Sequence, residues 1–239
     1  MTVILVLLTF AAFILLDWIL EEKPVVTPMP EVAATHARVT PLLDSVEGFH
    51  TPANVRYHPG HTWILRERKG YARVGMDEFA AALSGGIERL ELPRSGQWIR
   101  QGQRVIAVTR QGERVELVSP TEGEVVEINE EVLRNPALLR QQPYEKGWLF
   151  AVHVPDEEST SRNLVPTNLV RAWMSEAVHA VYALQPQAAG AIAADGARPA
   201  ADLLANLPEI PWQSNAAEFF LTRNHEKPAA TGMARELQS

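Results

Sequence analysis

The feature that most constrains the fold is the stretch 55–154, where short runs of alternating apolar and polar residues are separated by glycine-containing turns. Alternation with a period of two places apolar side chains on one face of a strand, and glycine supplies the backbone angles of tight turns. Two helical segments interrupt these runs, at 77–84, where Asp77 is a good N-cap, and at 130–140. The stretch therefore predicts a compact, mainly β domain.

The segment TRQGERVELVSP, residues 109–120, predicts a β-hairpin near the middle of this domain. Its centre, Gln111-Gly112, is typical of a two-residue turn, in which glycine accepts the required positive φ. Arg110 and Glu113 flank the turn, and more charges of both signs follow. Solvated strand faces with weak cross-strand ion pairs explain this pattern. The alternative is that Arg110 and Glu113 contact a partner protein.

Several motifs along the stretch, taken together and in order, resemble the glycine cleavage system H protein family. They are His61-Thr62-Trp63, Val74-Gly75-Met76 before a short helix, Leu90-Glu91-Leu92-Pro93, Ser119-Pro120, the run GEVVEIN at 123–129, Asn135-Pro136, Pro143-Tyr144 and Gly147-Trp148-Leu149. The resemblance implies a domain of the lipoyl type, a barrel-sandwich hybrid, over residues 55–158. It covers somewhat under half of the chain.

In that family, lipoate is attached to a lysine at the tip of the hairpin, ahead of a Ser-Pro pair. Counting back from Ser119-Pro120 without a gap puts Gly112 at this position. Lipoylation needs a side-chain amine, which glycine lacks. The resemblance therefore implies that the fold is kept, that the carrier chemistry is lost and that no cofactor is bound. The chain has four lysines, none on this hairpin: Lys23, Lys69, Lys146 and Lys227.

Residues 1–22 are predicted to form one transmembrane helix. Between Thr2 and Leu20 only Asp17 is charged, and these 19 residues span about 28 Å as a helix, close to the bilayer core. Asp17 can reach the headgroups or contact a partner helix, and Trp18 suits the aromatic belt. A cleaved signal peptide would need basic residues before the run and a small-residue cleavage site after it. We expect a single-pass protein of the cytoplasmic (inner) membrane, with its domain in the cytoplasm.

The domain is flanked by segments of different composition. Residues 23–54 contain five prolines and predict an extended tether, in which the apolar run 39–46 packs on an unidentified surface. Residues 159–223 predict a helical extension, with helices at 166–184, 200–207 and within 212–222, followed by a flexible tail at 224–239. The aromatic residues of the extension either cover the β domain or form a partner-binding face. They are Trp173, Trp212, Phe219 and Phe220.

Composition and motifs exclude several functions. The net charge of -7 gives no electrostatic case for nucleic acid, and the lack of cysteine excludes thiolate sites and disulfides. His50, His58 and His61 lie close together in the sequence, and with Glu67 or Asp77 they could be imagined as a metal site. Only the two histidines of HPGH are tightly spaced. We therefore interpret these histidines as structural rather than metal-binding. No nucleophile elbow, phosphate loop or dinucleotide motif is present, and we expect no enzyme.

Three functional hypotheses remain. The first is a non-catalytic, membrane-anchored subunit or scaffold of an integral membrane protein complex. A respiratory or other electron-transfer complex is one hypothesis for this partner, and it rests on the predicted anchor alone. The second is a lipoyl carrier of one-carbon or sulfur metabolism, modified at Lys69 or Lys146. The third is a periplasmic adaptor of the membrane-fusion type. Such adaptors resemble one another in a long helical hairpin inserted at the tip, and Gln111-Gly112 has no such insertion.

Overall fold

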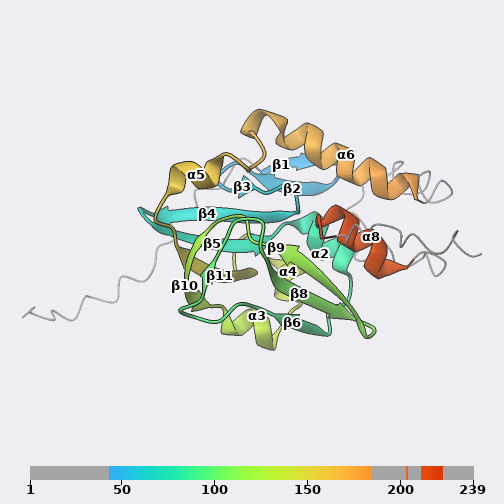
Figure 1. Ribbon diagram of the computed structural model, residues 1–239. Helices are drawn as coiled ribbons and strands as arrows, with labels where there is room; N and C mark the ends of the chain where they lie inside the picture. Colours follow the sequence, from blue (N-terminus) through green and yellow to red (C-terminus); the bar gives the residue numbers. More distant parts are fainter. Residues whose placement is uncertain (1–42, 185–202, 204–210, 223–239) are drawn as a thin grey trace, which may run out of the picture. The chain divides into compact units, whose positions relative to one another are not determined.

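The structure is a computed structural model that describes residues 43–184, 203 and 211–222 (Figure 1). The strands are β1 (Leu43–Val46), β2 (Phe49–Pro52), β3 (Arg56–Tyr57), β4 (Thr62–Arg68), β5 (Tyr71–Met76), β6 (Arg89–Glu91), β7 (Trp98–Ile99), β8 (Arg104–Arg110), β9 (Glu113–Val118), β10 (Gly123–Ile128) and β11 (Trp148–His153). The helices are α2 (Glu78–Ser84), α3 (Glu130–Arg134), α4 (Leu138–Gln141), α5 (Glu157–Ser161), the 3-10 turn η1 (Thr167–Leu169), α6 (Val170–Ala183) and α8 (Trp212–Phe219).

The strands form three antiparallel sheets. The largest has the order β3-β4-β5-β11-β10-β7, the second has the order β6-β8-β9, and β1 pairs with β2 alone. The two larger sheets contribute apolar residues to one core, including Val74, Ile106, Leu117, Val125 and Phe150. Burial of alternate residues on one face of each strand is what the period of two predicted. The prediction of a mainly β domain is confirmed.

Helix α2 is buried along its whole length. The side chain of Asp77 caps it by accepting a hydrogen bond of 2.7 Å from the Ala80 N–H, as the sequence predicted. Alanines on the helix permit close approach of its neighbours. Trp63 holds strand β5, which precedes the helix, in place. Its indole N–H donates to the Met76 carbonyl at 2.8 Å, and its ring lies against Gly75. No space is left there for a Cβ on Gly75. Helix α2 is therefore a rigid support for what packs on it.

Two sequence predictions need correction. Residues 43–52, assigned to the tether, form the hairpin β1–β2, because Glu47 and Gly48 adopt positive φ angles of 51° and 85° in a two-residue turn. The domain therefore begins before residue 55. Val46 is buried, so the expectation that the run 39–46 packs on a surface is confirmed for this residue. The single helix expected at 130–140 is split into α3 and α4, since Pro136 lacks the N–H that a continuous helix requires.

The helical extension is present in part. The helix expected at 166–184 is η1 followed by α6, which covers β1 and β2 in Figure 1, and the helix expected within 212–222 is α8. Of the helix expected at 200–207 only Leu203 is described, and its N–H donates to the Ala82 carbonyl of α2 at 3.1 Å. The predicted membrane helix at 1–22 and the predicted tail at 224–239 lie outside the described residues. Within the described ranges, no helix has both the length and the apolar character needed to span a bilayer.

Candidate functional site

The β8–β9 hairpin is the first part of the site. Its turn consists of Gln111 and Gly112 alone, with positive φ angles of 50° and 80°, which defines a turn of type I′. Both residues are exposed, and no heavy atom lies within 4 Å of the position that a Cβ of Gly112 would take. The prediction of a plain two-residue turn is confirmed. No side chain of residues 104–118 carries an amine, because this segment contains no lysine.

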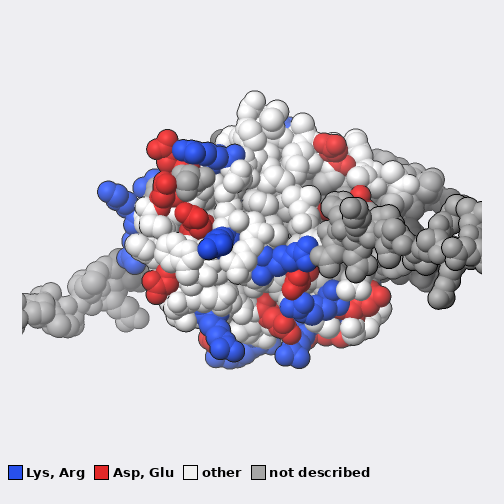
Figure 2. Space-filling model, in the orientation of Figure 1, with Lys and Arg blue, Asp and Glu red and all other residues white. Residues whose placement is uncertain are grey.

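Charged residues of both signs cover the hairpin. The Arg114 guanidinium lies 2.8 Å from the Glu116 carboxylate and 3.4 Å from that of Glu91 on β6, and Arg104 lies 3.7 Å from Glu116. Figure 2 shows acidic and basic side chains interspersed over this part of the surface. These groups are substantially exposed, so each pair contributes at most about 1 kcal/mol to stability. The network orients the strand faces without forming a surface of one charge.

Helix α8 packs against this hairpin and is the second part of the site. The Glu113 carboxylate accepts a hydrogen bond of 3.3 Å from the Gln213 N–H in the first turn of α8. The Gln213 side-chain amide donates to the Arg114 carbonyl at 2.9 Å. The Arg110 guanidinium lies 5.8 Å from the centre of the Trp212 ring, within the range of a cation–π contact. Arg110 and Glu113, predicted as partner contacts, therefore contact the chain's own C-terminal segment.

The aromatic residues of α8 and its end contribute to the core rather than to an open face. Phe220 is completely buried and Trp212 is 8% exposed, with its indole N–H donating to the Leu83 carbonyl of α2 at 2.9 Å. Phe219 is half-buried, with its ring centre 5.5 Å from that of Phe79. The hypothesis that these aromatics form a binding face is corrected for Trp212 and Phe220, because a buried side chain cannot meet a partner while α8 is in place.

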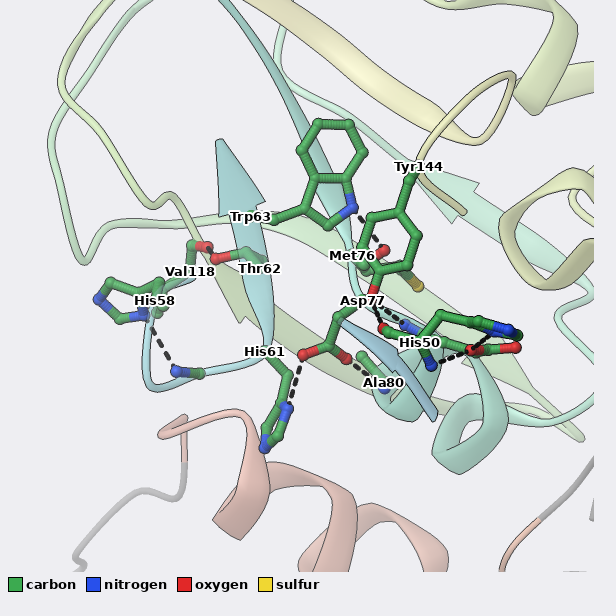
Figure 3. Close-up of polar contacts among 12 residues, drawn as sticks. His50, His58, His61, Thr62, Trp63, Met76, Asp77, Ala80, Val118 and Tyr144 are labelled. Carbon is green, nitrogen blue, oxygen red and sulfur yellow. Dashed lines mark hydrogen bonds and ion pairs between the residues drawn. The ribbon is translucent and has the colours of Figure 1, made fainter. Parts of the chain in front are cut away.

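A buried His–Asp pair lies beside this helix. His61 Nδ1 is 2.8 Å from Asp77 Oδ2, and both side chains are almost completely buried (Figure 3). The His61 ring lies between two aromatic rings, with centres 4.4 Å away in Phe79 and 4.6 Å away in Trp173 of α6. Trp173, which was also predicted as a partner contact, is thus half-buried and stacks on His61. Helix α6 thereby covers the pair.

The two other histidines of the predicted cluster have separate partners. His50 Nδ1 lies 2.9 Å from Glu78 Oε2, and His58 Nδ1 accepts the Gly60 N–H at 3.0 Å. Burial, with a smaller contribution from His61, lowers the pKa of His58 to about 4. Figure 3 shows that these rings do not converge on one point. Within the described ranges, no group of three or more His, Cys, Asp or Glu residues has the arrangement of a metal site.

Two lysines are described, and one of them is at a hairpin turn. Lys69 and Gly70 form the turn between β4 and β5, and Lys69 is exposed. Lys146 is also exposed, but it lies in the loop before β11, where its carbonyl accepts a hydrogen bond from the Asn129 side chain at 2.8 Å. Lys23 and Lys227, together with the predicted membrane contacts Asp17 and Trp18, lie outside the described residues.

Sequence reasoning missed the residues that fasten the C-terminal segment to β9. Besides Gln213, these include Thr222, whose hydroxyl donates to the Glu116 carbonyl at 2.9 Å. Neither residue belongs to a motif, and polar side chains near a helix end normally face solvent. The only available signal was the apolar spacing of Trp212, Ala216 and Phe219-Phe220, which predicts a helix with one buried face but not the surface that it covers.

The two larger sheets share one core, and the three-stranded sheet presents an exposed two-residue hairpin, as the resemblance to a lipoyl-type domain led us to expect. Comparison of the chain with known protein families agrees with this class. The family model described as "Glycine cleavage H-protein" matches residues 55–177. The chain belongs to the glycine cleavage H-protein family.

The sequences of two relatives support the same assignment. The glycine cleavage system H protein of Streptomyces coelicolor is 34% identical over 106 residues, which are 44% of this chain and 85% of the relative. That of Alcanivorax borkumensis is 39% identical over 106 residues, covering 44% and 82% of the two chains. A crystal structure of a glycine cleavage system H protein from Mycobacterium marinum is 24% identical, with a TM-score of 0.46, and covers 53% of this chain and 98% of that one.

Proposed function

We propose that this chain is a non-catalytic, membrane-anchored H-protein-like subunit or scaffold of an integral membrane protein complex, and that it carries no lipoate. The observation that carries the proposal is the turn between β8 and β9, which consists of Gln111 and Gly112. A lipoyl arm is held by an amide to a side-chain amine, and neither residue has one. Arg110 and Arg114 carry guanidinium groups, which do not replace that amine.

The membrane part of the proposal rests on the N-terminal sequence. Residues 2–20 are long and apolar enough to span a bilayer, and the prolines that follow suit a tether to the folded domain. The expected location is the cytoplasmic membrane, with the domain on the cytoplasmic side. The expected partner is a complex of integral membrane proteins, because an anchored domain without a cofactor acts through the proteins that it contacts.

The test restores an amine at the tip. We would co-express the unmodified chain, Gln111→Lys and Gly112→Lys with a lipoate–protein ligase and measure intact masses. Gln111→Lys is the better variant, since a residue with a side chain already occupies that position at positive φ, whereas Gly112→Lys adds backbone strain. We expect one lipoyl group on the tip-lysine variants and none on the unmodified chain. Lipoate on the unmodified chain would overturn the proposal.

The anchor and the partners need a separate measurement. We would fractionate cells that produce the full chain, extract the membranes with mild detergent and identify the proteins purified with it. A matched variant with three leucines of the apolar run changed to arginine, Leu5→Arg, Leu8→Arg and Leu15→Arg, should be lost from the membrane fraction. Recovery of that variant in the membrane at the same level would refute anchoring by this segment.

One observation favours a second function, that of a lipoyl carrier with a displaced attachment site. Lys69 occupies an exposed two-residue hairpin turn, the kind of position in which an attached arm would be free to move. If the unmodified chain gains lipoate in the same mass measurement, Lys69→Arg should abolish it, while Lys146→Arg should have no effect. Both substitutions retain the positive charge, so they change only the acylable amine.

A further inference from the structure

Strand β9 lies at the edge of the sheet β6-β8-β9. Arg110 and Glu113 flank the two-residue turn and therefore form a hydrogen-bonded pair. Because such pairs alternate along an antiparallel ladder, the backbone groups of Val115 face β8, and those of Arg114 and Glu116 point away from it. This outward edge is a template on which a further strand could pair.

The outward carbonyls of β9 are all taken by side chains. The Arg114 carbonyl accepts from the Gln213 side chain at 2.9 Å, and the Glu116 carbonyl accepts from the Thr222 hydroxyl at 2.9 Å. Further along, the Val118 carbonyl accepts from the Thr62 hydroxyl at 3.0 Å. Figure 1 shows α8 beside β9. Two of the three donors thus come from the C-terminal segment 211–222, which we term the cover.

Apolar contacts hold the cover in place. Ala216 and Phe220 are completely buried, and Trp212 is nearly so. The Cβ that Gly60 lacks would lie 2.9 Å from the Phe220 carbonyl, so the end of the cover sits directly on the loop before β4. The polar contacts to β9 are few and partly exposed, whereas the apolar face is buried. A single charge on that face should therefore release the cover.

We propose that the cover closes the β9 edge in cis, and that its release opens β9 for antiparallel pairing with β9 of a second copy of this chain. The strand is complementary to itself about Val115. In the register that places Val115 opposite Val115, Arg114 lies opposite Glu116 twice, once on each side of the two-fold axis. These are the residues whose backbone groups point outward, so the same register forms the hydrogen bonds and pairs opposite charges. The proposal does not depend on the absence of lipoate.

The experiment uses the full chain in detergent and reads its oligomeric state by light scattering, with the detergent mass subtracted, at several protein concentrations. Ala216→Asp places a carboxylate on the buried face of α8. Its matched control is Ser214→Asp, which adds the same charge to an exposed position of the same helix. We expect the protein mass to roughly double for Ala216→Asp as concentration rises, and to stay that of a single chain for Ser214→Asp and for the unmodified chain.

Charge reversal tests the register. In the Ala216→Asp background, adding Arg114→Glu should abolish the dimer, since a glutamate would face Glu116 across the axis. Adding Glu116→Arg alone should abolish it as well, and the two changes together should restore it. A dimer that survives either single reversal would overturn the proposed pairing, and so would a monomeric Ala216→Asp variant that melts cooperatively.

If Ala216→Asp does not fold, Phe220→Ala takes its place, because it removes a completely buried ring of the cover without burying a charge. Phe219→Ala, which removes a half-buried ring of the same segment, is the matched control. We expect Phe220→Ala to dimerise at a lower protein concentration than Phe219→Ala. A folded Phe220→Ala variant whose mass stays that of a single chain at every concentration would overturn the proposal.

Discussion

The carboxylate of Glu113, next to the hairpin turn, accepts a hydrogen bond from the backbone N–H of Gln213, a hundred residues further along the chain. The contact joins the hairpin to the first turn of α8, where the positive end of the helix dipole favours a carboxylate. The hairpin that resembles a carrier's attachment site is thus part of a surface shared with the C-terminal extension. The exposed Gln111-Gly112 turn projects beyond that surface.

The two adjacent phenylalanines at the end of α8 should differ in their effect on stability. Phe220→Ala removes a completely buried ring and should lower the free energy of unfolding by about 3–5 kcal/mol. Phe219→Ala removes a half-buried ring and should cost about 1–2 kcal/mol. Urea denaturation followed by circular dichroism would measure both. Equal losses would contradict the burial of Phe220 described above.

The Asp77 carboxylate should stabilise the fold in two ways, by capping α2 and by pairing with His61. Asp77→Ala removes both the cap of α2 and the partner of His61, so we expect a loss of about 3–5 kcal/mol. Asp77→Asn retains an oxygen that can cap Ala80 and should lose about half of that. Thermal unfolding of the two variants separates the roles. Similar melting temperatures for both variants would mean that the cap gives little of the stability.

The pKa of His58 makes stability depend on pH. The pKa in the folded protein, about 4, is below the ordinary value of 6.5, so the unfolded chain binds the proton more tightly. Stability from the neutral ring is therefore fully present above pH about 6.5 and is lost as the pH falls towards 4, by at most about 3 kcal/mol. His58→Asn, which keeps an acceptor for the Gly60 N–H, should remove this component.

Denaturation of the unmodified chain and of His58→Asn should be compared at pH 7.5, 6 and 4.5, as differences, because carboxylates titrate in the same range. A difference between the two chains that stays constant over this range would show that the ring does not remain neutral in the folded state.

Gly75 should tolerate no side chain. The missing Cβ would overlap the Trp63 ring, so Gly75→Ala must displace the indole and weaken its hydrogen bond to Met76. We expect a loss of about 1–3 kcal/mol and a change in tryptophan fluorescence. Gly86→Ala is the matched control, because no heavy atom lies within 4 Å of its added methyl group. Equal stability of the two variants would be inconsistent with this packing.

The sequence by itself determined the features that depend on local chemistry. Alternating residues fixed most strands of the sandwich, Asp77 fixed the start of α2, and Gln111-Gly112 fixed the type I′ turn, because periodicity, capping and turn angles are properties of neighbouring residues. The absence of an amine from that hairpin is likewise a property of the sequence. The family resemblance followed from the order of such local motifs.

Only the tertiary structure decided what covers the hairpin and which aromatics are buried. Phe219 and Phe220 are neighbours with the same side chain, yet one is half-buried and the other completely buried, since burial depends on the surface that α8 meets. In the same way, the sequence predicted Arg110 and Glu113 to be solvated charges or contacts to a partner protein, whereas in the folded chain they contact α8. Contacts between distant segments arise from the combined packing of the whole core, to which no local pattern corresponds.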